Sequence, residues 1–579
     1  MEHKETIVGN GNESDIRRLL LTGDTTLDPL GRLLERGRES PRLQTSAAPY
    51  GQVYQILLDA AHPVWAFQPD VIVVWTAPQL TLPSFGKLLN FESETATGAY
   101  EAVLREAEQF AAAVVRTASR VGQVLVPTWV LPTYERWIQT LTWRQGVGPA
   151  NLLAKANLIL AEKFAARQNI VLLDAGYWQA SLGRPSHDPR MYAVAKILYS
   201  QSLFEKAATE IKAVLRGSLG QGKKVIVCDL DNTLWGGVAG DDGPNNIKLG
   251  APDPVGECFH AFQRTLKGLR SRGILLTICS KNDEKFALSV IEEHPAMALR
   301  KSDFVAWRIN WRDKAENLLA LAKELNLGLD SFVFLDDNSR ERDQIRQVLP
   351  QVYAPDLPVS PSDLAPFLSS LNCFETAKVS TEDFVRTEMY QAERGRQETL
   401  ELSGDVENWL GSLQIKVRVA PLRRESLSRA AQLLNKTNQF NLSLRRLDEE
   451  SFWDWAEEPS NAAYTFQVSD RFGDFGLTGL ASISLAGTEA RIVDFVMSCR
   501  VMGKKVEEAL LGYVQAQARA AGADRIIALP VDGPRNGPAK AFFAAKFSSG
   551  DGAAIDPARV GIPPQIRLDE EVLEAKSAL

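Results

Sequence analysis

An apolar run that ends in a pair of carboxylates constrains the fold of this chain more than any other feature. Residues 225–228 read Val-Ile-Val-Cys, and Asp229 and Asp231 follow them with one leucine between. Runs of this kind, bounded by polar residues, are typical of strands buried in parallel sheets, which are covered on both faces. In open α/β sheets, ligands bind at the carboxyl ends of such strands. We therefore expect an α/β fold that presents both carboxylates at its ligand-binding edge.

Length and composition limit the number of domains and the kinds of partner. A chain of 579 residues exceeds one ordinary core, so about two to four domains are expected. The formal net charge of −7 provides no basic surface for nucleic acid, and no apolar run is long enough to cross a bilayer. Five cysteines without a paired spacing favour reduced thiols over disulfides or a zinc cluster. We expect a cytoplasmic protein that binds neither nucleic acid nor membrane.

The first predicted domain spans residues 1–215. Apolar runs at residues 71–75, 123–127 and 170–174 alternate with helical patterns, which indicates a parallel sheet in an α/β domain of the SGNH-hydrolase type. In this domain Thr25 and His187 resemble the nucleophile and base of a serine esterase. A catalytic hydroxyl also needs a nearby base and an oxyanion hole, which a threonine and one distant histidine do not provide. We expect a non-catalytic domain that docks partners or supports its neighbour, with a hydrolase site as the alternative.

The second predicted domain, residues 216–375, begins with a break rich in glycine and lysine. Three polar clusters follow the strand that ends at Asp229, each at the end of a predicted strand or the start of a predicted helix. They are Ser280, Lys314 and the pair Asp336 and Asp337. Because the carboxyl ends of parallel strands meet at one edge of a sheet, these side chains should converge around Asp229.

These groups match the requirements of phosphoryl transfer. Asp229 can attack phosphorus to form an aspartyl phosphate. Asp231 can protonate the leaving oxygen and later take a proton from water. Ser280 can hydrogen bond to the phosphoryl group, and Lys314 can offset its charge. The sequence therefore predicts a catalytic set made of these four residues.

Carboxylates beside the nucleophile indicate a metal site. Asp336 and Asp337 add negative charge next to Asp229, which would be repulsive without a cation. Oxygen ligands with room for water molecules fit Mg²⁺. We therefore expect Mg²⁺ to be bound by these three aspartates.

The four clusters resemble the four motifs of the haloacid dehalogenase (HAD) superfamily. The sequences at residues 231–238, 280–282 and 334–338 resemble, more narrowly, its FkbH-like branch, as does a polar segment at residues 435–441. Longer members of that branch have an esterase-like N-terminal domain and an acetyltransferase-like C-terminal domain. The resemblance thus implies a central HAD-type Rossmann-like sheet with one domain before it and one after it.

This resemblance implies a glyceryl-carrier-protein synthase, which is both a phosphatase and a glyceryltransferase. Such an enzyme takes 1,3-bisphosphoglycerate, removes the 3-phosphate and loads the glyceryl unit as a thioester on the phosphopantetheine of an acyl carrier protein, in polyketide-type antibiotic biosynthesis. We also expect the backbone carbonyl of Asp231 to be a metal ligand. The side chains expected to bind substrate or phosphate are Asn232, Thr233, Lys281 and Asn282.

Capture of an acyl group requires a nucleophile that can leave again, for which a thiol is suited. Cys228 and Cys279 lie within one residue of the predicted site, although strand alternation points each of them away from it. A role as a small buried hydrophobic side chain is the favoured alternative for both. Some relatives carry a cysteine between the two aspartates, where this chain has Leu230. Direct transfer to the thiol of the carrier is therefore open as well.

The segment after the aspartates, residues 236–256, is rich in glycine, aspartate and asparagine. It is too short for a folded cap domain, and it predicts a loop or small flap. A site without a cap can admit a group that is tethered to another protein.

The third predicted domain, residues 376–579, begins with a charged helix at about residues 381–402 and resembles the α+β GNAT acetyltransferases. Residues beyond about 548 are expected to be loosely ordered. Apolar or alternating runs predict strands at residues 413–419, 464–468, 479–483 and 491–497.

A glycine-containing turn after the last of these strands leads into a helix and resembles the pyrophosphate loop of GNAT enzymes. Arg500, Gly503 and Lys505 occupy this turn, where free backbone N–H groups and the helix dipole favour an anion. Lys505 stands where the loop requires a small residue. We therefore expect recognition of the phosphopantetheine arm in preference to acetyl transfer from coenzyme A, with a structural role as a third option.

Three functions are open at this stage. The first is glyceryl loading of a carrier protein, and the second is a Mg²⁺-dependent HAD phosphatase acting on a different phosphoester or phosphoprotein. The third is a scaffold with an inactive site. The complete set of motif residues argues against the scaffold, and the third domain argues against a simple phosphatase. Glyceryl loading is the preferred hypothesis.

Overall fold

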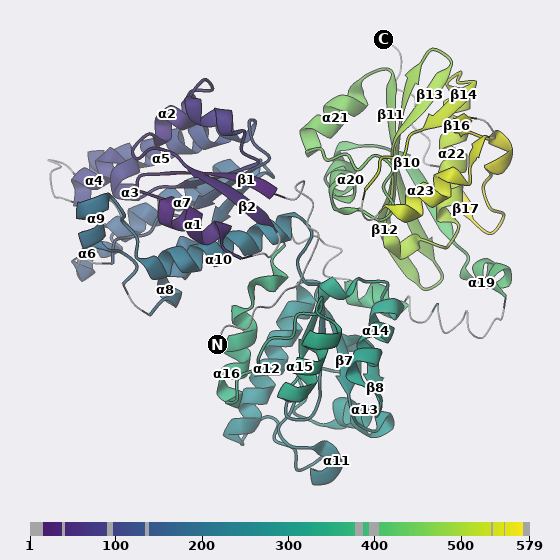
Figure 1. Cartoon of the computed structure of the whole chain (residues 1–579), viewed down its shortest axis with the longest axis horizontal. Coiled ribbons are helices and arrows are strands. Elements are labelled where there is room, and N and C mark those ends of the chain that lie inside the picture. Colours follow the sequence, from purple (N-terminus) through teal and green to yellow (C-terminus); the bar gives the residue numbers. More distant parts are fainter. Residues whose placement is uncertain are drawn as a thin grey trace, which may run out of the picture. The chain divides into compact units, whose positions relative to one another are not determined.

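The structure, a computed structural model, divides into two compact units, Met1–Ser218 and Leu219–Leu579. The first unit ends a few residues beyond the predicted boundary at 215, because helix α10 (Gln201–Ser218) continues to Ser218. Within the described residues no helix is both long and apolar enough to cross a membrane. The structure describes residues 16–37, 41–89, 96–133, 138–183, 185–376, 386–392, 396, 405–533, 536–548 and 551–570 (Figure 1).

The first unit contains a five-stranded parallel sheet in the order β2-β1-β3-β4-β5. The three predicted strands are confirmed, whereas β1 was not predicted because Arg17 and Arg18 interrupt its apolar run. The strands are β1 (Ile16–Gly23), β2 (Arg42–Ala47), β3 (Val71–Trp75), β4 (Gln123–Pro127) and β5 (Ile170–Leu173).

Helices cover both faces of this sheet, which explains why its central strands are apolar along their whole length. Ile72 and Val74 of β3 pack with one set of helices, and Val71 and Val73 pack with the other. The first set contains α2 (Val53–Leu58), α5 (Ala96–Ala118) and α7 (Pro149–Ala165), and the second contains α1 (Asp28–Glu35), α8 (Ala175–Ser181) and α10.

The two residues that resemble an esterase pair have structural partners. The Thr25 hydroxyl donates to the Lys196 carbonyl at 2.9 Å and accepts from the Leu198 N–H at 2.8 Å. His187 Nδ1 lies 2.9 Å from Ser186 Oγ, and burial lowers the pKa of His187 to about 4. A hydroxyl has a single proton, and Thr25 gives it to a backbone carbonyl, so no base activates it. This geometry does not support the hydrolase alternative.

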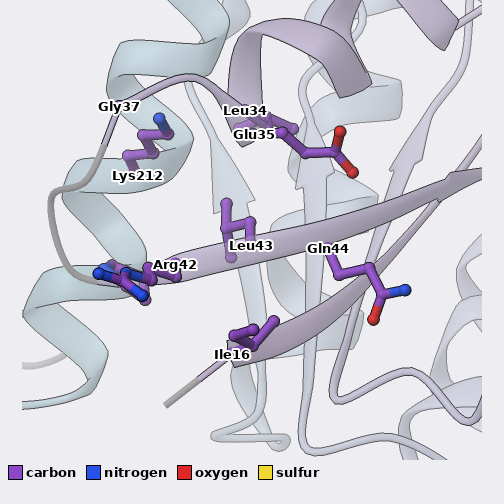
Figure 2. A pocket seen from close by; sticks show the side chains of 9 residues that line it. Ile16, Leu34, Glu35, Gly37, Arg42, Leu43, Gln44 and Lys212 are labelled. Atoms are coloured by element: carbon purple, nitrogen blue, oxygen red, sulfur yellow. The ribbon is translucent and has the colours of Figure 1, made fainter. Parts of the chain in front are cut away.

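A cavity of about 440 Å³ lies beside the first residues of β1 and β2 (Figure 2). Two of the charged side chains that line it have protein partners. Glu35 Oε1 accepts from Thr45 Oγ1 at 2.9 Å, and Lys212 Nζ donates to the Arg36 carbonyl at 2.5 Å. The cavity is at the amino ends of parallel strands, opposite the edge at which such sheets bind ligands.

The second unit begins with a four-stranded parallel sheet in the order β8-β7-β6-β9. The chain adds β7 and β8 on one side of β6 and then returns to place β9 on the other side. The resulting switch point between β6 and β9 is where open α/β sheets form a crevice for ligands. The strands are β6 (Val225–Cys228), β7 (Leu275–Ser280), β8 (Phe304–Ile309) and β9 (Phe332–Leu335).

This sheet is also covered on both faces, as the opening sequence feature predicts. Val225 and Val227 pack with α14 (Lys314–Glu324) and α15 (Ser339–Val348). Ile226 and Cys228 pack with the helices of the other face, α12 (Pro254–Ser271), α13 (Glu284–Glu293) and α16 (Pro361–Ser370). The segment between Trp235 and α12 contains only one short helix, α11 (Ala239–Asp242), so the expected small flap is confirmed.

The C-terminal part of the second unit is a mixed sheet with helices on both faces, as expected for an α+β domain. Its eight strands follow the order β15-β16-β14-β13-β12-β11-β10-β17. They are β10 (Lys416–Pro421), β11 (Asn461–Asp470), β12 (Gly473–Ala486), β13 (Glu489–Met497), β14 (Arg525–Ala528), β15 (Phe547–Ser548), β16 (Asp551–Ile555) and β17 (Arg567–Glu570). The helices are α19 (Val406–Leu413), α20 (Arg424–Lys436), α21 (Glu449–Glu457), α22 (Val506–Ala520) and α23 (Gly537–Ala544).

Two expectations for this region meet different outcomes. The expectation of loose order beyond residue 548 is wrong for residues 551–570, because β17 pairs in parallel with β10 and β16 pairs with β14. The predicted charged helix at residues 381–402 lies mostly outside the described residues.

The fold class, an α/β chain of several domains with parallel sheets, is confirmed.

Replacing Thr25 by valine should destabilise the first unit. The substitution keeps the shape but leaves the Leu198 N–H without its acceptor, which costs about 1–3 kcal/mol, whereas the Lys196 carbonyl still accepts from the Thr26 N–H. Chemical denaturation of the full chain measures this loss, and Thr25→Ser, which keeps the hydroxyl, is the matched control. Equal stability of the valine and serine variants would contradict the structural role of Thr25.

Candidate active site

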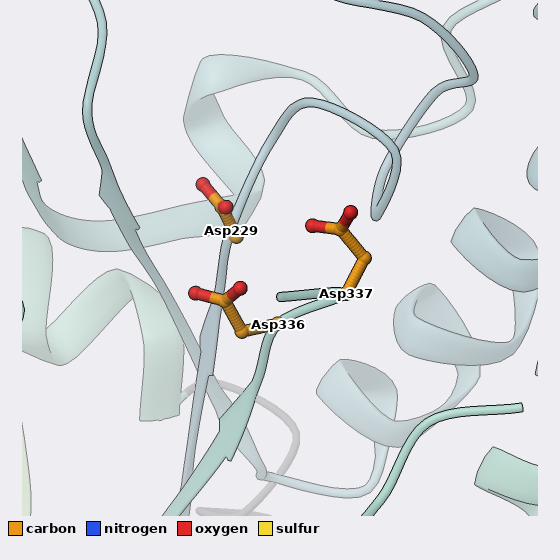
Figure 3. Close-up of side chains that lie close together, drawn as sticks. All are labelled: Asp229, Asp336 and Asp337. Atoms are coloured by element: carbon orange, nitrogen blue, oxygen red, sulfur yellow. The ribbon is translucent and has the colours of Figure 1, made fainter. Parts of the chain in front are cut away.

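Two aspartates meet at the switch point of the second unit. Cys228 of β6 pairs with Leu335 of β9, so Asp229 and Asp336 follow neighbouring strands at the same level. The Asp229 N–H donates to the Leu335 carbonyl at 2.9 Å, which extends the pairing by one residue. Asp337 follows at once, and Figure 3 shows its carboxylate together with the other two around one space. One ligand oxygen from each of the three lies within 4.8 Å of the others.

The chemistry of these donors fits a hard divalent cation. Asp229 and Asp336 are buried, whereas Asp337 is exposed at the mouth of the site. Burial and the neighbouring Asp229 carboxylate raise the pKa of both Asp336 and Asp337. Three carboxylates gathered in this way need positive charge, and oxygen donors with an opening to water suit Mg²⁺. Such an ion would neutralise charge on a bound phosphate.

Lys314 supplies permanent positive charge at the same place. Its Nζ lies 2.8 Å from Asp229 Oδ2 and 2.5 Å from Asp336 Oδ2. It is the first residue of α14, and Asp313 caps that helix by accepting from the Ala315 N–H. Burial alone would lower the pKa of Lys314, but the two carboxylates raise it, so the side chain stays an ammonium. The structure thus places Lys314 beside the predicted nucleophile.

Asp231 points to a different set of partners. Its Oδ1 accepts from Trp235 Nε1 at 2.8 Å and from the Ala239 N–H at 3.0 Å, and its Oδ2 accepts from Asn282 Nδ2 at 3.1 Å. Burial raises the pKa of this carboxyl, although the N–H donors oppose that shift. A raised pKa is the direction that a general acid requires, because the carboxyl group then keeps its proton to a higher pH than an exposed one.

Ser280 ends β7 and is buried at the same edge of the sheet. The side chains expected to bind substrate or phosphate have partners within the protein. The Thr233 hydroxyl accepts from the Asp337 N–H, and Asn232 Oδ1 accepts from the Gly237 N–H. Lys281 Nζ lies 2.6 Å from Glu341 Oε1. Together with Asn282, these side chains fix the loops that carry the aspartates.

The two candidate thiols lie in the packed core on opposite faces of the sheet. Cys228 belongs to the cluster with α12, and Cys279 to the cluster with α14. Burial raises the pKa of Cys228, and it raises the pKa of Cys279 to about 12. A buried, protonated thiol is a poor nucleophile, so this placement favours the hydrophobic role for both.

Two residues that hold the site were not predicted from the sequence. Arg342 Nη1 donates to the carbonyls of Asp336 and Asp337 at 2.6 and 2.8 Å and so fixes the loop after β9. Trp235 donates its indole N–H to Asp231. Arg342 is one of several charged residues at the start of α15, and Trp235 lies in the segment that resembles the FkbH-like branch, but neither residue type indicates the partner that it holds.

The turn expected to bind phosphopantetheine is filled by groups of the chain itself. Arg500 Nε donates to Ser498 Oγ at 3.1 Å, and Lys505 pairs with Glu407. Burial raises the pKa of Glu507, although the backbone N–H groups of Gly503 and Glu507 act in the opposite direction by hydrogen bonding to it. A carboxylate thus occupies the position at which a bound anion would need these N–H groups.

The neighbouring strand edge is also occupied. β14 pairs with β13 only at residues 489–492. Further along β13, the Leu442 N–H donates to the Phe495 carbonyl at 3.0 Å, and the Met497 N–H donates to the Phe440 carbonyl at 2.9 Å. The polar segment singled out in the sequence therefore ends in an isolated antiparallel β-bridge between Asn441 and Val496 of β13. An extended ligand could pair there only after displacing it.

A comparison with protein-family models found no match, and a comparison with curated proteins found none either. Among solved structures, the chain is similar to the N-terminal part of BF1531 from Bacteroides fragilis, which contains a phosphatase domain and was crystallised with Mg. The two are 30% identical, with a TM-score of 0.57, and the match covers 63% of this chain and 95% of that one.

Two further similarities are too low to support an argument. The Escherichia coli ribosomal-protein-S18-alanine N-acetyltransferase is 15% identical with a TM-score of 0.18, and the match covers 22% of this chain and 74% of that one. The acetylxylan esterase Axe2 from Geobacillus stearothermophilus is 11% identical with a TM-score of 0.24. The match covers 34% of this chain and 93% of that one. The identity to BF1531 over almost its whole length, together with four HAD motifs at one sheet edge, shows that this chain belongs to the family of HAD-type phosphatases.

Proposed function

We propose that the second unit is a Mg²⁺-dependent phosphatase that works through an aspartyl phosphate on Asp229. The observation that supports this most directly is the contact of Lys314 Nζ with both Asp229 and Asp336, next to a third carboxylate. The ammonium holds Oδ2 of Asp229 and the Leu230 N–H donates to Oδ1 at 2.8 Å, so the carboxylate of the nucleophile is oriented at both oxygens. The ion expected at the three carboxylates is the one with which the related BF1531 domain was crystallised.

The reaction follows from the positions of the side chains. An oxygen of Asp229 attacks phosphorus, the bond from phosphorus to the ester oxygen breaks, and Asp231 gives that oxygen its proton. Water then attacks the aspartyl phosphate at phosphorus and gives a proton to the Asp231 carboxylate. The bond between phosphorus and Asp229 breaks, so the products are an alcohol and inorganic phosphate. Lys314 balances the charge on the phosphoryl oxygens.

For the substrate, we propose 1,3-bisphosphoglycerate, with delivery of the glyceryl unit to an acyl carrier protein. The FkbH-like sequences around the motifs support this assignment, and the small flap supports it because a tethered group needs an open site. In the acyl transfer, the carrier thiolate attacks the acyl phosphate carbon, the bond from that carbon to the phosphate oxygen breaks, and a thioester and phosphate form. Since Cys228 and Cys279 are buried, direct transfer to the carrier is the simpler route.

A second candidate is hydrolysis of another phosphoester or of a phosphoprotein. The same open site favours it, because the four-residue helix α11 is the only regular element between β6 and α12 in this fully described segment. The two candidates share every step at Asp229 and differ only in whether a carrier receives an acyl group.

Asp229→Asn should abolish the phosphoenzyme. The amide cannot form an acyl phosphate, so turnover of any phosphoester should fall by roughly 10⁴-fold or more, the size of loss seen when other hydrolases lose a catalytic residue. Acid-quenched intact-mass measurement with substrate and Mg²⁺ should find the phosphate adduct on the wild type only. An adduct that persists in the variant would rule out Asp229 as the nucleophile.

Mg²⁺ should raise the thermal unfolding midpoint of the wild-type chain, because an ion that binds only the folded state stabilises it. Asp336→Asn removes a buried ligand and should abolish this shift, and chelation should abolish the activity of the wild type. Asp343→Asn, which changes an exposed carboxylate on α15, should keep the full shift. A shift of the same size in both variants would place the ion elsewhere.

Intact-mass spectrometry of a holo carrier protein distinguishes the two candidate functions. The carrier is incubated with the full chain, Mg²⁺ and 1,3-bisphosphoglycerate. Loading predicts a glyceryl adduct without phosphate on the carrier, and the Asp229→Asn variant should leave the adduct phosphorylated or unformed. An unmodified carrier, with phosphate released into solution, would support the simple phosphatase instead.

A further inference from the structure

The carboxylate of Asp231 is held by N–H donors from three separate segments of the second unit. Trp235 lies in the turn after β6, Ala239 begins the flap helix α11, and Asn282 follows β7. The Trp235 side chain is fully buried, and Asn282 is 7% exposed, so neither readily exchanges its bond to Asp231 for one to water. Three supports of this kind leave the carboxylate a single orientation.

Local structure fixes each donor in turn. The Leu234 N–H donates to the Leu230 carbonyl at 2.8 Å, which closes the turn and brings the Trp235 indole over Asp231. Asn282 Oδ1 accepts from the Asp283 N–H at 2.9 Å, so the amide is oriented with its Nδ2 toward Asp231. The Ala239 N–H belongs to the first turn of a helix, where backbone donors have no partner within the helix.

The two oxygens of the Asp231 carboxylate differ in the number of hydrogen bonds that they accept. A carboxylate oxygen has two acceptor positions. Oδ1 of Asp231 uses both, for Trp235 and Ala239, whereas Oδ2 accepts only from Asn282. Oδ2 therefore has a position left at which a proton can be carried. Displacement of a catalytic group by about 1 Å can cost about 100-fold in rate, so the support of this oxygen matters.

We propose that Trp235 and Asn282 are positioning residues for proton transfer, which hold Asp231 so that its Oδ2 exchanges the proton with the leaving oxygen and with water. The flap also contributes, because the Ala239 N–H donates to Asp231. The position of the flap and the orientation of the Asp231 carboxyl group are therefore linked. The inference rests on the proposed role of Asp231 as general acid and base.

The test uses leaving groups that differ in their need for a proton. Phosphoenzyme formation is measured by acid quench in the full chain with Mg²⁺ and three probes: para-nitrophenyl phosphate, phenyl phosphate and 3-phosphoglycerate. Asp231→Asn should slow the reaction of the alkyl phosphate by about 10²–10⁴-fold. Asn282→Ala and Trp235→Phe should each slow it by about 10-fold or more, with KM nearly unchanged. The same variants should slow the para-nitrophenyl ester by less than about 3-fold, because a weakly basic leaving group hardly needs an acid.

Matched controls separate positioning from general damage. Asn317→Ala removes another buried amide near this edge, one that is bonded to Asn310, and Trp307→Phe removes an indole N–H that donates to Glu284. Both should leave the ratio of the alkyl to the para-nitrophenyl rate at the wild-type value. Equal slowing of all three probes in Asn282→Ala and Trp235→Phe would overturn the positioning role. A wild type that forms no phosphoenzyme with any probe would instead overturn the proposed phosphatase function.

Discussion

The contact of one ammonium with two buried carboxylates is the interaction on which the rest of the site depends. Lys314 Nζ lies between Asp229 and Asp336, which would otherwise repel each other in a region shielded from water. Removing one partner of such a buried group typically costs about 3–5 kcal/mol, because the remaining charge is left uncompensated. The sheet order makes this contact possible, since it places β9 next to β6. Helix α14 then delivers the lysine at its first residue.

Charge balance also explains why the four aspartates of the site have different environments. Asp229 and Asp336 share the ammonium, and Asp337 faces the opening, so these three form the part of the site suited to a cation and a phosphate. Asp231 is only two residues from Asp229, yet its oxygens are turned to N–H donors of the flap turn and of Asn282. Two carboxyl groups that are neighbours in sequence therefore have separate environments, which permits one to attack and the other to carry a proton.

Much of this site could be predicted from the sequence, because strand ends in a parallel sheet meet by geometry. The strand before Asp229, the convergence of Lys314 and Asp336, and the small flap all follow from local patterns. Strand β1 escaped prediction because Arg17 and Arg18 hide its periodicity, and β17 because its pairing with β10 joins segments far apart in the chain. Side-chain partners across loops, such as Arg342 with the Asp336 carbonyl, have no periodic signal at all.

The same limit applies to Asn282, which the resemblance to the FkbH-like branch assigns to substrate or phosphate binding. An amide at a strand end can bind an anion or a neighbouring carboxylate, and only its partners decide between these roles. Here Asn282 Oδ1 is taken by the Asp283 N–H, which leaves the Nδ2 group directed at Asp231. The Nδ2 group carries two hydrogens, and one of them is committed to Asp231. Under the proposed mechanism, the segment that carries Ser280 would therefore contribute a serine at the phosphate edge and an asparagine that orients the proton donor.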